Sequence, residues 1–169
     1  MKCPSCHTEN IEGADECTNC GQSLYGLDLP EAGHKTSSPA FISEALARLP
    51  KREAATIGIT DPVALAVRRM QTGGTAAVLV MDGDRLAGII TSWDILQKVA
   101  GQKVDLNAVS CAQIMTLDPI VFHDEDSIVL AINKMSSGDF RHIPIVRDDR
   151  PVNVIDVNDV FRFITPYLV

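Results

Sequence analysis

The chain has 169 residues, of which 46% are hydrophobic and 22% are charged, a composition that suits one ordinary globular domain with a small appendage. Fifteen basic and 22 acidic residues give a formal net charge of −7, which argues against a general electrostatic grip on DNA, RNA or an anionic membrane. No apolar run reaches the length of a membrane span, and no secretory signal follows Met1. We therefore expect a cytoplasmic protein without nucleic-acid or membrane partners.

Four of the five cysteines lie in the first twenty residues as two Cys-x-x-Cys pairs: Cys3, Cys6, Cys17 and Cys20. Each pair can form a knuckle that supplies two thiolates, so the spacing predicts one tetrahedral metal site. Structural zinc is the leading interpretation, and it would provide most of the folding free energy of so short a segment. Two disulfides are disfavoured because nothing marks the chain as secreted, a redox dithiol would need only one pair, and iron is an alternative because it also suits four thiolates.

This segment resembles the short N-terminal zinc ribbons of the form Cys-Pro-x-Cys-Gly … Cys-x-x-Cys-Gly. It departs from that pattern at His7, where the family usually has glycine. We expect His7 to be a solvent-facing turn residue rather than a ligand, because four thiolates already complete the shell. The remaining cysteine, Cys111, is expected to be a small buried apolar residue.

Residues 41 onward contain an internal repeat. Shifting the chain by 65 residues aligns two halves without a gap from Ala47 to Asp94, which brings Asp61 onto Asp126 and Met70 onto Met135. Each half predicts the same elements in the same order: a short helix (41–49; 110–115), a brief strand (54–58; 119–122), an amphipathic helix (61–72; 126–137), two strands joined by a tight polar turn (76–81 and 85–90; 142–146 and 150–155) and a last helix (92–100; 157–166).

The domain organisation follows from these patterns. Residues 21–40 are rich in glycine, proline and serine and show no helical or strand period, which predicts a linker. We expect a zinc ribbon at 1–22, a linker at 23–40, a first repeat at 41–103 and a second repeat at 104–169.

Three strings of residues carry a resemblance to a known family. They are Ile114-Met115-Thr116 with Pro119-Ile120, the run Arg141-His142-Ile143-Pro144-Ile145-Val146, and the run Gly88-Ile89-Ile90-Thr91-Ser92-Trp93-Asp94. Residues 41–168 thereby resemble the tandem cystathionine-β-synthase (CBS) domain pair, called a Bateman module. The resemblance implies an α+β fold of two β-α-β-β-α repeats packed as a pseudo-twofold pair, a disc-like homodimer, and regulatory binding of AMP, ATP or S-adenosylmethionine.

The resemblance implies a ribose site at Thr91 and Asp94, since the matching threonine and aspartate of the family hold the ribose. A carboxylate can accept both hydroxyls of a ribose diol, and the helix N-terminus favours an anion. The same two residues are also explained without a ligand, because Thr91 as N-cap and Asp94 at the third helical position form a capping box. Adenine is expected against apolar strand edges near Ile57 or near Pro119 and Ile120.

The second half departs from this signature. Asp156 replaces the threonine ahead of Asp159, which adds a second carboxylate where a phosphate would approach. We expect this second site to be empty or to take a ligand that bears a cation.

Arg141 and His142 match the position that often meets phosphate in the family, and an arginine fork suits phosphate. The first half has Ala76 and Ala77 there. Our preferred hypothesis is one composite cleft between the halves; the alternative is a solvated arginine beside a hydrogen-bonded histidine.

We expect no enzymatic activity, because the sequence has no nucleophile elbow, no phosphate loop and no His-x-x-x-His pair. The leading interpretation is a sensor that binds an adenosyl ligand, forms a homodimer and contacts an unidentified protein partner through its ribbon. The alternatives are a ligand-free protein-interaction scaffold and an iron-loaded, rubredoxin-like electron-transfer module.

Overall fold

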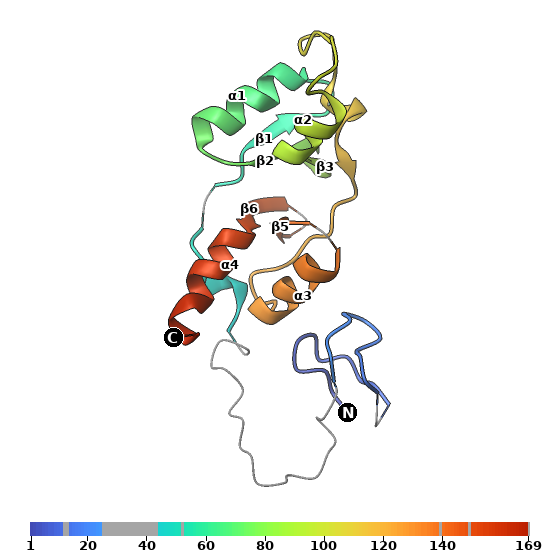
Figure 1. Ribbon diagram of the computed structural model, residues 1–169, viewed down its shortest axis with the longest axis vertical. Helices are drawn as coiled ribbons and strands as arrows, with labels where there is room; N and C mark the ends of the chain where they lie inside the picture. Colours follow the sequence, from blue (N-terminus) through green and yellow to red (C-terminus); the bar gives the residue numbers. More distant parts are fainter. Residues whose placement is uncertain (12–13, 25–43, 52, 139, 149, 169) are drawn as a thin grey trace. The chain divides into compact units, whose positions relative to one another are not determined.

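The computed structural model describes residues 1–11, 14–24, 44–51, 53–138, 140–148 and 150–168 (Figure 1). Almost all of the expected linker lies outside these residues. The chain forms two compact units. Unit 1 comprises Met1–Pro50, His123–Arg141 and Asp156–Val169, and unit 2 comprises Lys51–Phe122 and His142–Ile155. Each unit therefore combines segments from both sequence repeats, and the expected domain boundaries stay a prediction.

Unit 2 contains a four-stranded sheet with the strand order β1-β2-β3-β4. Strand β1 (Thr56–Gly58) runs parallel to β2 (Ala77–Asp82), which pairs antiparallel with β3 (Arg85–Thr91), and β3 pairs antiparallel with the short β4 (Thr116–Leu117). Helix α1 (Val63–Gly73) connects the two parallel strands, and helix α2 (Ser92–Lys98) follows β3 directly. This mixture of sheet and helices confirms the expected α+β class.

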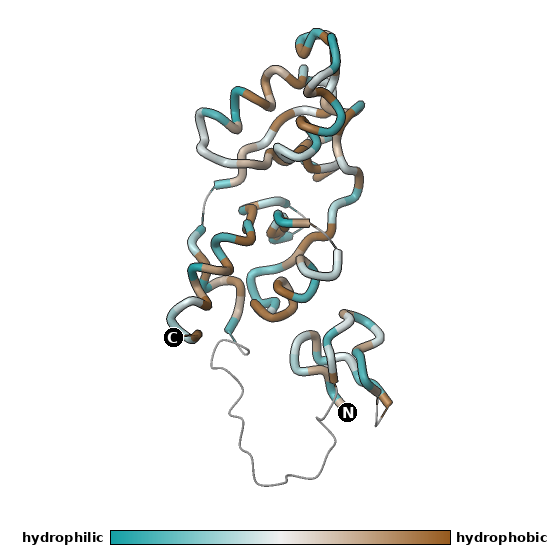
Figure 2. Tube along the Cα trace, viewed as in Figure 1, coloured by the Kyte–Doolittle hydropathy of each residue, from teal (hydrophilic) through white to brown (hydrophobic). Residues whose placement is uncertain are grey.

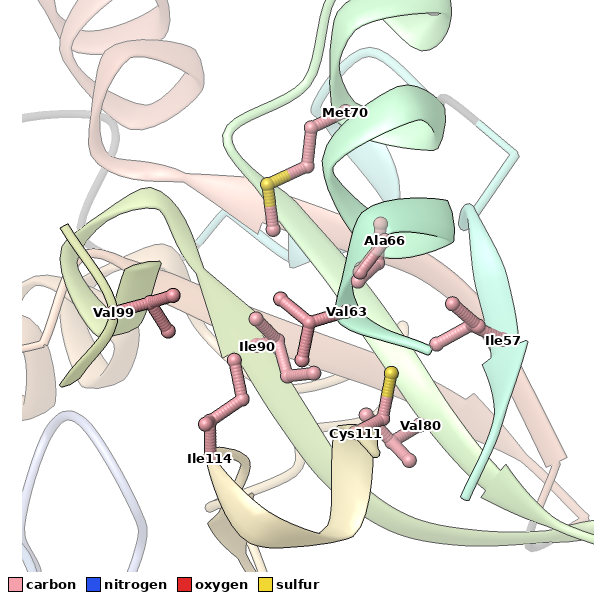
Figure 3. Close-up of a cluster of buried hydrophobic side chains, with 10 residues drawn as sticks. Ile57, Val63, Ala66, Met70, Val80, Ile90, Val99, Cys111 and Ile114 are labelled. Atoms are coloured by element: carbon pink, nitrogen blue, oxygen red, sulfur yellow. The ribbon is translucent and has the colours of Figure 1, made fainter. Parts of the chain in front are cut away.

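The core of unit 2 lies between α1 and the sheet (Figure 3). Helix α1 buries Val63, Ala66 and Met70, whose spacing places them on one face of the helix. In Figure 2 hydrophobic and hydrophilic segments alternate along α1, as this amphipathic pattern requires. Cys111 is fully buried in the same core, as expected. Burial, together with the nearby charge of Asp61, raises the pKa of its thiol to about 11.

The elements of the second half repeat those of the first with the same offset of 65 residues. Strands β5 (His142–Arg147) and β6 (Arg150–Asp156), which lie in unit 2 up to Ile155, correspond to β2 and β3. In unit 1, α3 (Ile128–Gly138) corresponds to α1, and α4 (Val157–Ile164) corresponds to α2 and leads into the 3₁₀ turn η4 (Thr165–Tyr167). Even the register recurs, because the parallel bridge between Phe122 and Ile145 repeats the pairing of Ile57 with Val80.

The structure corrects the expected short elements. The strand expected at 119–122 is reduced to a single bridge at Phe122. Asp118 has a positive φ of 44° and Pro119 has no amide hydrogen to donate, so an extended ladder cannot form there. Within the described residues the expected short helices are the 3₁₀ turns η2 (Leu46–Arg48) and η3 (Cys111–Gln113), and residues 41–43 of the first one lie outside the described part. No helix of the described residues is long and apolar enough to span a membrane.

Gly88 is required by the contact between β3 and β4. A Cβ atom at this position would lie 2.7 Å from the Thr116 carbonyl oxygen and 2.8 Å from the Met115 sulfur. The second repeat has the buried Asn153 at the matching position, where it forms a bridge with Glu53. The absence of a side chain at Gly88 therefore allows Met115 and Thr116 to lie close to β3.

Candidate functional sites

The four N-terminal cysteines converge on one point in unit 1. Their Sγ atoms all lie within 4.8 Å of one another, and the Cys3–Cys20 and Cys6–Cys17 sulfur pairs are each separated by 3.5 Å. Four zinc–sulfur bonds of about 2.3 Å would space the sulfurs about 3.8 Å apart. All four are free thiols rather than disulfides. The cluster therefore fits one tetrahedral metal, as the spacing predicts.

The two knuckles have the same backbone pattern. The amide of His7 donates to the Cys3 carbonyl at 2.9 Å, and the amide of Gly21 donates to the Cys17 carbonyl at 2.9 Å. Both residues have positive φ angles, 57° for His7 and 68° for Gly21. His7 is exposed, and the metal-ligand cluster found among the described residues consists of the four cysteines alone. The expectation of a solvent-facing turn residue is confirmed, and His7 adopts a conformation that glycine reaches more easily.

Local hydrogen bonds prepare one of these thiols for metal binding. Burial opposes ionisation of Cys17, but the main-chain amides of Cys20 and Asn19 and the side chain of Asn10 outweigh burial and lower its pKa to about 6. Burial raises the pKa of Cys20 above its ordinary value. A metal ion binds the thiolate form, so a bound cation would favour ionisation of all four groups.

Thr91 and Asp94 form the expected capping box at the start of α2 in unit 2. The Asp94 Oδ2 atom accepts hydrogen bonds from the Thr91 amide at 2.8 Å and from the Thr91 hydroxyl at 2.6 Å. Asp94 is only 7% exposed. Its second oxygen, Oδ1, accepts from the Lys98 ammonium at 2.8 Å and from the Thr116 hydroxyl at 3.3 Å.

Lys98 is a neighbour of Asp94 that the sequence analysis does not identify. Its ammonium also donates to the Ile114 carbonyl at 2.6 Å, and its side chain stays 39% exposed. A carboxylate has about four acceptor positions, so four internal donors use the whole capacity of Asp94. Burial raises the pKa of Asp94, but the bonds from Lys98 and Thr91 outweigh burial and hold the pKa below its ordinary value. The available signal was a lysine four residues after an aspartate on a helix.

The matching positions of the second repeat lie in unit 1. Asp156 caps α4 and accepts from the amides of Asn158 at 2.6 Å and Asp159 at 3.1 Å. Asp159 is 2% exposed and accepts from the Asp156 amide at 3.1 Å. Phe163 stands where the first repeat has Lys98. Two carboxylates therefore lie together at the start of α4, as the sequence indicates.

The other predicted ligand contacts are dispersed. Ile57 is 3% exposed and packs in the core of unit 2, so its side chain is not open to a ligand. Pro119 is half-buried and Ile120 is 48% exposed. Arg141 is exposed in unit 1, whereas His142 begins β5 in unit 2. Because its residues fall in different compact units, the composite cleft stays a prediction.

Family models match both parts of the chain. The CBS domain model matches residues 46–101 and 111–166, and a zinc-ribbon domain model matches residues 2–24. This second match ends at residue 24, and Leu24 is fully buried beside the cysteines.

Relatives and solved structures agree with these matches. The CBS domain-containing protein CBSCBSPB1 of Arabidopsis thaliana is 31% identical over 151 residues, which cover 80% of this chain and 28% of that protein. CBSX3, a mitochondrial CBS domain-containing protein of the same plant, is 33% identical over 107 residues, or 60% of this chain and 52% of that protein. The chain spans about a quarter of the length of the first curated relatives it matches.

Two solved structures illustrate the likeness of fold. A putative signal-transduction protein with CBS domains from Burkholderia ambifaria is 28% identical, with a TM-score of 0.66 over 72% of this chain and 90% of its own. A CBS domain protein from Pyrobaculum aerophilum, solved in complex with AMP, is 22% identical, with a TM-score of 0.62 over 69% of this chain and 89% of its own. With two matched copies in the observed 65-residue repeat, this chain belongs to the CBS-domain family and carries a zinc-ribbon domain ahead of the pair.

Proposed function

We propose that this protein is a non-catalytic regulatory sensor whose CBS pair binds an adenosine-containing ligand: AMP, ATP or S-adenosylmethionine. The observation that carries this proposal is the Asp94 carboxylate at the end of β3. Its Oδ2 atom is held by Thr91, and its Oδ1 atom is bonded to Lys98 and Thr116, which a ligand can displace. The AMP complex of the Pyrobaculum protein, which has the same fold, supports this ligand class. The ligand can regulate only by binding one conformation better than another.

The hydrogen bonds of Asp94 define how a ribose would bind. Oδ2 is held by the capping box, so a ribose diol would have to bind Oδ1 in place of Lys98 and Thr116. Lys98 is the last residue of α2 and its side chain is partly exposed, so its ammonium can move into water when ribose hydroxyls replace its bond to Asp94. We therefore assign the ribose to Asp94 of the first repeat. At the matching place in the second repeat, the two carboxylates Asp156 and Asp159 disfavour a phosphate.

Isothermal titration of the full chain with AMP, ATP and S-adenosylmethionine tests the proposal. We expect saturable binding of at least one of the three ligands. If none of the three ligands binds, the sensor is contradicted and the ligand-free scaffold is favoured. The four hydrogen bonds that Asp94 accepts within the protein would then explain why no ligand binds there.

A structural zinc in the ribbon is the second part of the proposal. The four thiols would hold the ion and close its shell, so the metal would supply folding free energy rather than chemistry. Metal analysis that finds one equivalent of zinc in colourless purified protein would support this assignment. A coloured, iron-containing protein would instead favour the electron-transfer alternative.

We also propose a homodimer, in which a second copy covers exposed apolar side chains on the last helix of each repeat. Trp93 and Leu96 on α2 are 62% and 59% exposed, and Phe161 on α4 is 60% exposed. Phe161 also lines an apolar cavity of about 280 Å³ between α3 and α4. Light scattering of the wild-type protein should give twice the mass of the chain. Phe161→Glu should lower the measured mass toward that of one chain, and a monomeric wild-type protein would contradict the dimer.

A further inference from the structure

One face of α3 contacts both knuckles of the ribbon within unit 1. The Ser127 hydroxyl donates to the Ser5 carbonyl at 2.9 Å, and the Lys134 ammonium donates to the Asn19 carbonyl at 3.2 Å. Ser5 and Asn19 occupy the same place in their knuckles, directly before the second cysteine of each pair. The helix therefore binds equivalent carbonyls of the two knuckles.

Further contacts fill the space between these two hydrogen bonds. The Gln22 Oε1 atom accepts from the Ser5 hydroxyl at 2.9 Å and also from the Asn133 side-chain amide. Leu130 packs against the cluster of cysteines and Leu24. Ser127 directly precedes α3, and Ser127, Leu130 and Lys134 follow the three- and four-residue spacing of a single helix face.

A bound metal would fix the positions of the two knuckles that α3 contacts. Ser127 and Lys134 are seven residues apart, so their Cα atoms are separated by about two helical turns, or about 10.5 Å. The two knuckle carbonyls have to match that fixed separation. In the described part of the ribbon, the buried core consists of three cysteines, Ser5 and Leu24, so a bound ion would supply most of the free energy that holds the two knuckles together.

We propose that the metal-loaded ribbon docks on the Ser127–Leu130–Asn133–Lys134 face of α3, and that metal binding is thereby coupled to the second CBS repeat. Loss of the metal frees the ribbon and exposes Leu130. Coupling of this kind is reciprocal: the factor by which metal strengthens docking equals the factor by which docking strengthens metal binding. Variants that weaken docking must therefore lower the affinity for the metal. The inference rests on the proposed zinc site.

The first repeat provides a matched comparison. At the same four positions α1 and its N-cap have Pro62, Leu65, Arg68 and Arg69. Proline has no hydroxyl to replace that of Ser127, and Arg68 is longer than the amide of Asn133. The docking face is therefore specific to the second repeat.

Zinc affinity of the full chain, measured by competition with a chromophoric chelator, tests the coupling. Leu130→Asp should lower the affinity at least fivefold, the lower limit for typical coupling between sites. The double variant Asn133→Ala/Lys134→Ala should also lower the zinc affinity. Unlike Leu130→Asp, it introduces no new charge among the side chains that pack against α3. Arg68→Ala, at the matching position of the first repeat, should leave the affinity unchanged.

The possible results separate the two proposals. Equal zinc affinity in the wild type and in both docking variants would overturn the coupling and leave the zinc site intact. If the wild-type protein takes up no zinc, the zinc site and the coupling both fail. As a second measurement, chelation should shift the NMR signals of the Leu130 methyl groups and leave those of Leu65 in place; unshifted Leu130 signals would overturn docking.

Discussion

Asp94 illustrates how one side chain can serve both the fold and a ligand. Its two oxygens receive four hydrogen bonds, two from the helix cap and two from Lys98 and Thr116. The cap bonds explain why an aspartate is needed for folding. The other two bonds come from groups that a ligand can displace, so only that side of the carboxylate is open to recognition.

The pH dependence of stability should reveal the state of Asp94. Its pKa is held below the ordinary value of 3.8, so the ionised carboxylate stabilises the fold fully above that pH, and this contribution disappears as the pH falls through the lower folded value. Asp94→Asn should lower the free energy of unfolding by about 1.5–3 kcal/mol at pH 7. In urea titrations the gap between the variant and the wild type should narrow in acid; a gap that is constant from pH 7 to pH 2.5 would contradict this description.

Gly88 offers a second test at the residue scale. Gly88→Ala should destabilise the fold by about 1–3 kcal/mol, because its Cβ would overlap the Thr116 carbonyl oxygen and the Met115 sulfur. Gly73→Ala is the matched control, since its Cβ meets only Thr75 at an ordinary 3.5 Å and lies in helix α1. The control should be neutral or stabilising by up to about 1 kcal/mol. Equal effects of the two substitutions in thermal unfolding would refute the close contact.

At the scale of elements, the two capping boxes separate folding from recognition. Helix α2 is capped by Thr91 and helix α4 by Asp156, and both boxes are complete. Thr91→Asp should therefore keep α2 capped, but it should lower the free energy of unfolding by about 1.5–3 kcal/mol, because Asp94 loses the hydrogen bond from the Thr91 hydroxyl. The added carboxylate should weaken AMP binding, because it repels phosphate. Unchanged AMP affinity would show that the cap does not face the ligand.

The periodic elements could be predicted from the sequence, whereas the shortest ones could not. The amphipathic helices and the hairpins appear with the expected offset of 65 residues, because burial of one face imposes a strong local period. Strand β4 was missed because Thr116 and Leu117 form a strand only by pairing with β3, which is distant in sequence. Pairing of this kind depends on tertiary contacts rather than on local propensity.

At the scale of the whole molecule, the sequence predicted the metal cluster and the capping boxes but not their neighbours. The Cys-x-x-Cys and Thr-x-x-Asp spacings involve residues close together in the chain, so both can be recognised from the sequence alone. The bond from Thr116 to Asp94 and the contact of Leu130 with the cysteines join distant segments. The ribbon was expected to serve an outside partner, and the contacts with α3 indicate that one of its surfaces is used within the chain.

The most direct test of the account is the affinity of the full chain for AMP, measured by isothermal titration for the wild type, Asp94→Asn and Asp61→Asn. Asp61 also accepts a hydrogen bond from a backbone amide, that of Gly58 at 2.8 Å, so its variant controls for the loss of a carboxylate in unit 2. We predict saturable binding by the wild type and by Asp61→Asn, and at least a tenfold loss in Asp94→Asn, in line with about 1.5–3 kcal/mol for hydrogen bonds to a charged group. Equal AMP affinity in all three proteins would contradict the assignment of the ribose to Asp94, and no binding by the wild type would contradict AMP as the ligand.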